Sequence, residues 1–172
     1  GYLEKLQFYR PDFFDIERAR ALYAKLLFGL ERYEDAANML GALYASASTP
    51  AKLLDYGQLY IRALRAIDRP GDALRTCVDL HSTEGLAPDA KPVLSELATE
   101  LVSSALSFSE VTKLWQRYES DARWRFIQPM LGFKLAKIYY HTRDYDQSGQ
   151  LLASVIERFP GTEYGKRAAD FQ

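Results

Sequence analysis

The sequence has little of what catalytic and metal sites are built from. Its 172 residues include one cysteine, Cys77, and two histidines, His81 and His141. A single cysteine excludes an intrachain disulfide and a zinc site made of cysteines. The two histidines are 60 residues apart and lack an acidic partner at ligand spacing. No His-Glu-x-x-His, glycine-rich phosphate loop or Gly-x-Ser-x-Gly segment is present. We therefore expect no enzyme, no metal and no cofactor, and we expect Cys77 to be a small core residue.

The sequence also lacks a strong charge of either sign and a long apolar run. The net charge is −1 and the isoelectric point is near 6.2, so no overall field favours nucleic acid or anionic lipid. The longest apolar candidate, Ala19 to Leu30, contains Arg20 and Lys25, and no run approaches the ~18 apolar residues of a membrane span. There is neither an initiator methionine nor a signal peptide, so we expect a piece of a longer protein.

Apolar residues make up 48% of the chain, and their spacing around residues 132–161 predicts a helical hairpin. The first series recurs at intervals of three and four residues, which is one face of a helix: Leu131, Leu135, Ile138 and Tyr139. The second series is Leu151, Leu152, Val155, Ile156 and Phe159, and Pro160-Gly161 ends it. The link at 142–144 is short and polar, so the two helices must run antiparallel.

Weaker copies of this hairpin precede it at an even spacing. The residue that follows each turn is Ala36, Ala73, Val111 or Ser148, at intervals of 37, 38 and 37 residues. We expect Thr49 to cap the helix that begins at Pro50, and Ser107 with Glu110 to form a capping box. The pattern predicts an all-α solenoid of about four antiparallel helix hairpins plus a terminal helix, in one domain. The repeats fall at 12–48, 50–87, 89–124 and 126–160, and 162–172 is a partial unit or cap.

The clearest copy resembles the tetratricopeptide (TPR) repeat. The resemblance rests on Gly132-x-x-Leu135-Ala136-x-x-Tyr139, on Asp144-Tyr145-Asp146-x-Ser148-x-x-x-Leu152 and on Pro160. The family has a large residue where Gly132 stands and an aromatic residue where Leu152 stands, so these two positions depart from it. A TPR unit has ~34 residues, and the connecting loops can hold the excess. The resemblance implies a protein-binding scaffold without catalytic activity.

In stacked hairpins of this kind the first helices line a concave groove. Aligning the copies predicts ten groove contacts: Arg18, Lys25, Gln58, Arg62, Arg65, Glu96, Glu100, Lys134, Lys137 and Tyr140. We expect a peptide groove that uses charge for orientation and Tyr140 for contact, and the alternative is a solvated face. The mixed charges argue against a nucleic-acid surface. None of these positions is Asn, so we do not expect the family's Lys and Asn clamp for chaperone tails.

The segment from Val155 to Gly165, followed by Ala168-Ala169, is similar to one common in bacterial envelope TPR proteins. Outer-membrane assembly lipoproteins, cell-division coordinators and lipoprotein activators of peptidoglycan synthases share it. The resemblance implies a periplasmic or outer-membrane scaffold that docks another envelope protein, with a lipid anchor upstream. One alternative is a cytosolic TPR adaptor or regulator. Another is an accessory domain of an enzyme or ligand-binding protein whose main domain lies outside these residues.

Overall fold

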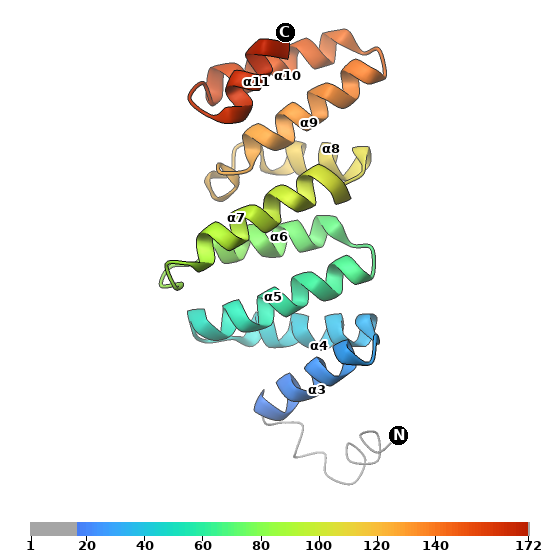
Figure 1. Ribbon diagram of the computed structural model, residues 1–172, viewed down its shortest axis with the longest axis vertical. Helices are drawn as coiled ribbons and strands as arrows, with labels where there is room; N and C mark the ends of the chain where they lie inside the picture. The colour runs from blue at the N-terminus through green and yellow to red at the C-terminus, as the bar shows by residue number, and fades with distance from the viewer. Residues whose placement is uncertain (1–16, 172) are drawn as a thin grey trace. The chain divides into compact units, whose positions relative to one another are not determined.

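The computed structural model describes residues 17–171, and all regular structure in that range is helical (Figure 1). The α-helices are α3 (Glu17–Gly29), α4 (Tyr33–Ser46), α5 (Pro50–Ala66), α6 (Pro70–His81), α7 (Ala90–Glu100), α8 (Phe108–Tyr118), α9 (Gln128–His141), α10 (Tyr145–Arg158) and α11 (Glu163–Phe171). A π-helix, Leu101–Ala105, continues α7, and a 3-10 turn, Ala122–Trp124, precedes α9. The predicted all-α class is confirmed. Residues 12–16 of the predicted first repeat lie outside the described range. Within that range no helix combines the length and apolar character needed to cross a membrane.

The chain forms two compact units. The N-terminal unit comprises residues 1–76 and 83–88, and the C-terminal unit comprises residues 77–82 and 89–172. Helix α6 contributes its first part to one unit and its last five residues to the other. In the N-terminal unit, α4 packs against both α3 and α5. In the C-terminal unit, α9 packs against α8, α10 and α11.

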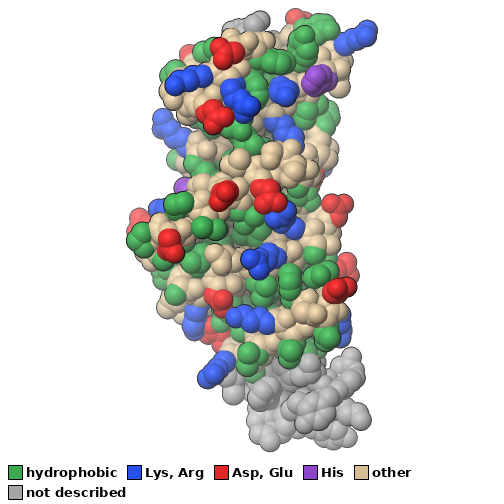
Figure 2. Space-filling model, viewed as in Figure 1, with side chains coloured by type: hydrophobic (Ala, Val, Ile, Leu, Met, Phe, Trp, Pro, Cys, Tyr) green, Lys and Arg blue, Asp and Glu red, His purple; other side chains and the backbone are tan. Residues whose placement is uncertain are grey.

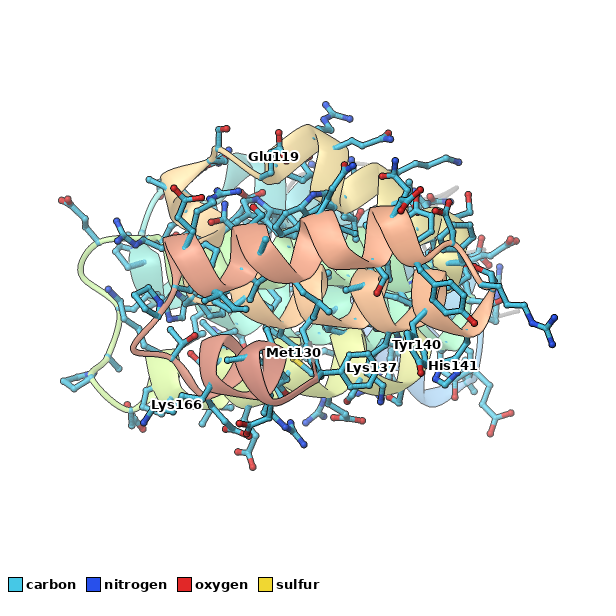
Figure 3. The ribbon with its side chains drawn as sticks, turned by 90° about the horizontal axis from the view of Figure 1, so that it is seen from above. Glu119, Met130, Lys137, Tyr140, His141 and Lys166 are labelled. Carbon is cyan, nitrogen blue, oxygen red and sulfur yellow. The ribbon has the colours of Figure 1, made fainter. Side chains whose placement is uncertain are left out.

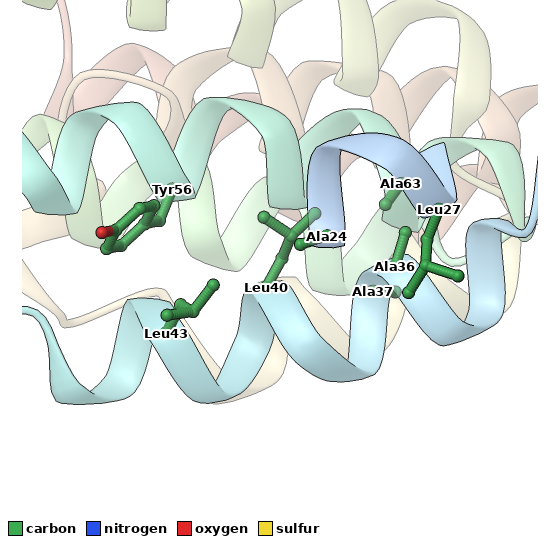
Figure 4. Packing of buried hydrophobic residues seen from close by; sticks show 8 residues of the cluster. All are labelled: Ala24, Leu27, Ala36, Ala37, Leu40, Leu43, Tyr56 and Ala63. Atoms are coloured by element: carbon green, nitrogen blue, oxygen red, sulfur yellow. The ribbon is translucent and has the colours of Figure 1, made fainter. Parts of the chain in front are cut away.

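The core of the N-terminal unit lies where α3, α4 and α5 meet (Figure 4). Leu40 and Leu43 stand three residues apart on α4, so they lie on one face of that helix and are both buried. They form a cluster with Ala24, Leu27, Ala36, Ala37, Tyr56 and Ala63. Four of the eight residues are alanines, which lets α4 come close to both neighbours.

Three of the helix-to-helix turns have the same backbone geometry. Glu31, Asp68 and Arg143 each adopt a left-handed conformation, with φ of 59°, 57° and 65°. After α9, the amide of Arg143 donates to the Tyr140 carbonyl (3.0 Å), and the amide of Asp144 donates to the Tyr139 carbonyl (2.9 Å). Equivalent pairs of bonds close α3 and α5. This is the Schellman motif, which satisfies carbonyl groups at a helix end. Its recurrence shows that three of the predicted turns share one structure.

The turn before α8 differs because a π-helix precedes it. From the buried small residue Ala98 on α7 to Val111 on α8 there are 13 residues. The other pairs of buried residues are 12 apart: Ala24 with Ala36, Ile61 with Ala73, and Ala136 with Ser148. A π-helix holds one more residue per turn than an α-helix, and the amide of Leu106 donates to the carbonyl of Leu101 (3.3 Å). The extra residue is therefore accommodated inside the helix.

The predicted helix caps are present. The Thr49 hydroxyl accepts a hydrogen bond from the Lys52 amide (3.3 Å), with Pro50 in the first helical position. Ser107 and Glu110 form the capping box: the Ser107 amide donates to Glu110 Oε2 (2.9 Å), and the Glu110 amide donates to Ser107 Oγ (3.4 Å). These local signals fix where α5 and α8 begin.

Gly132 is buried in α9 at a point where two neighbouring helices come close. A methyl group at its Cα would lie 2.6 Å from Val155 Cγ2 on α10 and 2.9 Å from the Trp115 ring on α8. Trp115 therefore fills the space that a large side chain on α9 would occupy. The packing at this position therefore leaves no room for the large residue that the TPR pattern has there.

We predict that Gly132→Ala lowers the free energy of unfolding by about 1–3 kcal/mol, because the added methyl group overpacks the contact with Val155 and Trp115. Urea unfolding monitored by circular dichroism measures the change. The matched control is Gly149→Ala in α10, where nothing lies within 4 Å of the new methyl group. This control gains helix propensity and should be up to about 1 kcal/mol more stable than the parent. Equal stability of the two variants would contradict the described packing.

Candidate functional site

The ten predicted groove residues lie on first helices of the predicted pairs, divided between the two units. In the N-terminal unit they are Arg18 and Lys25 on α3 and Gln58, Arg62 and Arg65 on α5. In the C-terminal unit they are Glu96 and Glu100 on α7 and Lys134, Lys137 and Tyr140 on α9. On the face of the N-terminal unit drawn in Figure 2, basic, acidic and apolar side chains are interspersed. Of the ten, the structure brings Arg18 and Lys25 together around a shared hollow.

This hollow lies between α3 and α5 and has a volume of about 510 Å³. It is open to solvent on one side, and its walls come from one face of each helix. On α3 the lining residues are Glu17, Arg18, Ala21, Leu22 and Lys25, and on α5 they are Lys52, Asp55 and Tyr56. We call it the α3–α5 hollow. Sequence reasoning found two of its eight residues.

Glu17 joins the two walls of the hollow. One carboxylate oxygen accepts a hydrogen bond from Lys52 Nζ (2.7 Å), and the other accepts one from the Tyr56 hydroxyl (2.7 Å). The hydrogen bond from Lys52 and, to a smaller extent, the bond from Tyr56 hold the pKa of the Glu17 carboxyl below its usual value. The hydrogen bond between Tyr56 and Glu17, together with partial burial, raises the pKa of Tyr56 to about 12. The Tyr56 hydroxyl thus remains a donor to Glu17 at neutral pH, and this bond continues to join α3 to α5.

The charges around the hollow are not all paired. Lys25 Nζ lies 3.3 Å from Asp55 Oδ2, and Lys52 pairs with Glu17. Among residues 17–171, Arg18 has no ion-pair partner and its side chain is exposed. Three basic and two acidic side chains line the hollow, which leaves one excess positive charge. A guanidinium presents five donors in a planar fork that matches a carboxylate.

An apolar surface lies beside Arg18. Ala21 and Leu22 form it, and the Leu22 side chain is exposed. Within residues 17–171, the hollow therefore offers an unpaired cation next to an apolar contact, and hydrogen bonds join its two walls. That combination suits a peptide segment that carries an acidic side chain close to an apolar one.

The Lys134 side chain reaches back to the end of the π-helix. Its ammonium group donates hydrogen bonds to the carbonyl oxygens of Val102, Ser103 (3.3 Å) and Leu106 (3.1 Å). These carbonyls stand at the end of the π-helix, where the helix itself cannot satisfy them. Burial lowers the pKa of Lys134. The sequence pattern placed Lys134 on a polar face of its helix. The carbonyl groups that accept its hydrogen bonds lie 28 to 32 residues earlier in the chain, and helix periodicity cannot predict such a distant contact.

Lys137 and Tyr140 lie near the end of α9, close to α11 (Figure 3). The Tyr140 ring meets the rings of Phe171 (5.1 Å between centroids) and Tyr145 (5.5 Å) edge-on. Lys137 Nζ lies 6.0 Å from the centroid of Phe133. Tyr140 is half exposed, so it belongs to an aromatic cluster and still presents part of its surface to solvent.

The remaining candidates for chemistry have structural positions. Cys77 is fully buried, and its thiol donates to the Leu94 carbonyl (3.1 Å). Burial raises the pKa of Cys77 to about 12, so the sulfur stays protonated, and the prediction of a small core residue is confirmed. The His81 ring stacks on Phe126 at 3.9 Å, and burial lowers the pKa of His81. In the described part of the chain, no three His, Cys, Asp or Glu side chains are grouped to hold a metal ion.

Known proteins provide no reference for this site. Comparison of the chain with protein-family models, with curated proteins and with solved structures found no match. The assignment of a function therefore depends on the contacts of the described residues and on the repeat pattern.

We predict that Lys134→Met destabilises the C-terminal unit by about 1–3 kcal/mol, because the carbonyls at the end of the π-helix lose a charged donor. The amides of residues 101–106 should also exchange hydrogen faster, which exchange measured by mass spectrometry will show. The control is Lys113→Met, at an exposed position of α8, which should change neither quantity. Unchanged exchange in Lys134→Met would contradict the capping role.

Proposed function

We propose that this protein is a non-enzymatic scaffold of the TPR type that holds a peptide segment of another protein. Three Schellman turns with the same geometry support the repeat, and so do the buried residues at 12- and 13-residue spacing. The observation that carries the binding role is the α3–α5 hollow, where Arg18 has no ion-pair partner among residues 17–171 and lies beside the exposed Leu22. The hollow lies on two first helices, the elements that line the groove in this architecture.

The arrangement of the hollow favours binding over a purely structural role. Glu17, Lys52 and Tyr56 satisfy one another, so the site is formed before a ligand arrives, and less conformational entropy is lost on binding. Arg18 takes no part in that network. Its guanidinium is therefore available to a carboxylate of the ligand, and Leu22 is available to an apolar side chain one or two residues away.

The peptide specificity can be tested by selecting from a random peptide library displayed on phage, with the full chain as bait. We expect enriched peptides to combine an acidic and an apolar residue. Arg18→Gln should weaken the binding of a selected peptide by at least about tenfold, because it removes a charge-assisted hydrogen bond. Asn38→Asp is the control, since it changes the net charge equally on an exposed face of α4 that lies away from the hollow. Peptides that lack an acidic residue, or an equal loss in both variants, would refute the proposal.

We also propose that the protein works in the bacterial periplasm or at the outer membrane and docks another envelope protein. The support is the resemblance carried by Val155 to Gly165. Hydrogen bonds hold part of that segment in a turn. Thr162 Oγ1 accepts a hydrogen bond from the Gly165 amide (3.0 Å) and donates one to the Phe159 carbonyl (2.8 Å). A methyl group on Gly165 would lie 2.0 Å from that carbonyl oxygen, so this turn into α11 requires glycine.

Fractionation of bacterial cells that produce the natural full-length protein tests the location. We expect an antibody to detect it in the periplasmic or outer-membrane fraction. Recovery in the cytosolic fraction, with intact periplasmic and cytosolic marker proteins as controls, would show the location to be wrong while leaving the peptide-binding role open.

A further inference from the structure

A second hollow lies in the C-terminal unit, where the ends of α8 and α10 meet the start of α9. Its volume is about 310 Å³, which is the size of the smaller ligand pockets of proteins. Its polar lining includes Glu119, Asp121, Arg125, Gln128 and Arg158. We call it the α8–α10 hollow. In Figure 3, Glu119 lies on the opposite side of this unit from Lys137 and Tyr140, so the hollow is separate from those two predicted groove contacts.

Hydrogen bonds hold the walls of this hollow together. The Gln128 amide nitrogen donates to the carbonyl oxygens of Tyr118 (2.8 Å) and Asp121 (3.0 Å), which fixes the link after α8 against the start of α9. The Arg158 guanidinium donates to the Glu119 carbonyl, which joins the end of α10 to the same link. These contacts form without a ligand, so less conformational entropy is lost when one binds.

Gln128 also presents an unused acceptor to the hollow. Its side chain is 4% exposed, and both of its nitrogen-bound hydrogens face backbone carbonyls, which cannot donate in return. The amide oxygen must therefore point away from these carbonyls, and it accepts no hydrogen bond from residues 17–171. No fully buried side-chain oxygen in that range lacks a partner, so this oxygen is accessible where Gln128 lines the hollow.

The hollow has unpaired charges of both signs. Asp121 is already paired with Arg123, whose Nη2 lies 2.6 Å from the Asp121 carboxylate. Three other charged side chains of the lining have no ion-pair partner among residues 17–171: Glu119, Arg125 and Arg158. The hollow therefore offers two guanidinium groups, one carboxylate and the amide oxygen to a ligand. A ligand that satisfies all of them must carry an anionic group and a cationic donor.

We propose that the α8–α10 hollow binds a free α-amino acid. The α-carboxylate pairs with the guanidinium groups of Arg125 and Arg158, and the α-ammonium group donates to the Glu119 carboxylate and to Gln128 Oε1. An inorganic anion would leave Glu119 and the amide oxygen unmatched, and a simple amine would face two cations. The carboxyl end of a peptide has an amide in place of the ammonium group, so it brings no charge to Glu119. This site does not depend on the proposed peptide site, which lies in the other unit.

The probes for this proposal are the twenty standard L-amino acids, each added separately to the full 172-residue chain. We expect at least one to raise the unfolding temperature and to bind with a Kd below about 1 mM in isothermal titration calorimetry. Arg125→Gln and Glu119→Gln should each weaken that binding by at least about tenfold, because each removes a charge-assisted hydrogen bond. The matched controls are Lys166→Gln and Glu157→Gln, which make the same charge changes at exposed positions outside the hollow and should leave the affinity unchanged.

Blocked forms of the amino acid that binds test the proposal on the unaltered chain, so the test stands even if a variant fails to fold. The N-acetyl form lacks the ammonium group and the methyl ester lacks the carboxylate, and each should bind at least about tenfold more weakly. Equal affinity for the N-acetyl form would show that the carboxylate alone is recognised, which overturns the proposal. Failure of all twenty amino acids to bind below about 1 mM overturns it as well, as does an equal loss in the control variants. None of these outcomes bears on peptide binding at the α3–α5 hollow.

Discussion

The structure depends on how closely the two helices of a hairpin can approach. At the crossing of α9 and α10, Ser148 is buried, and its hydroxyl donates directly to the Ala136 backbone carbonyl (2.9 Å). Such a contact exists only if both positions are small, because a larger side chain would separate the backbones. Ala24 with Ala36 occupies the equivalent positions in the first hairpin. In the N-terminal unit this packing fixes α3 against α4, and α5 packs on the same helix, so that side chains of α3 and α5 meet around a hollow.

The charges of that hollow have two roles. The pairs Glu17–Lys52 and Lys25–Asp55 connect α3 to α5, and since their side chains are about half exposed they contribute little to stability. Their main effect is to hold the walls in one arrangement. Arg18 lies outside both pairs and gives the hollow its excess positive charge. Structure and recognition are thus divided between different side chains of the same short helix.

Features that depend on local spacing could be predicted from the sequence. The helices, the capping by Thr49, the capping box of Ser107 and the burial of Cys77 follow from neighbours within about four residues or from apolar periodicity. The π-helix could not be predicted, because one inserted residue leaves the apolar pattern nearly unchanged. The hydrogen bonds of Lys134 could not be predicted either, because its carbonyl acceptors are distant in sequence. For the same reason, Glu17 and Tyr56 were not recognised as part of the site: their contact joins residues 39 positions apart.

The most direct test of the central claim, that the α3–α5 hollow recognises a peptide through Arg18 and Leu22, is a crystal structure of the chain with a selected peptide. The account predicts a peptide carboxylate within hydrogen-bond distance of the Arg18 guanidinium and an apolar peptide side chain on Leu22. It also predicts that the bonds of Glu17 to Lys52 and Tyr56 are retained. A peptide bound elsewhere, with Arg18 exposed to solvent, would contradict it.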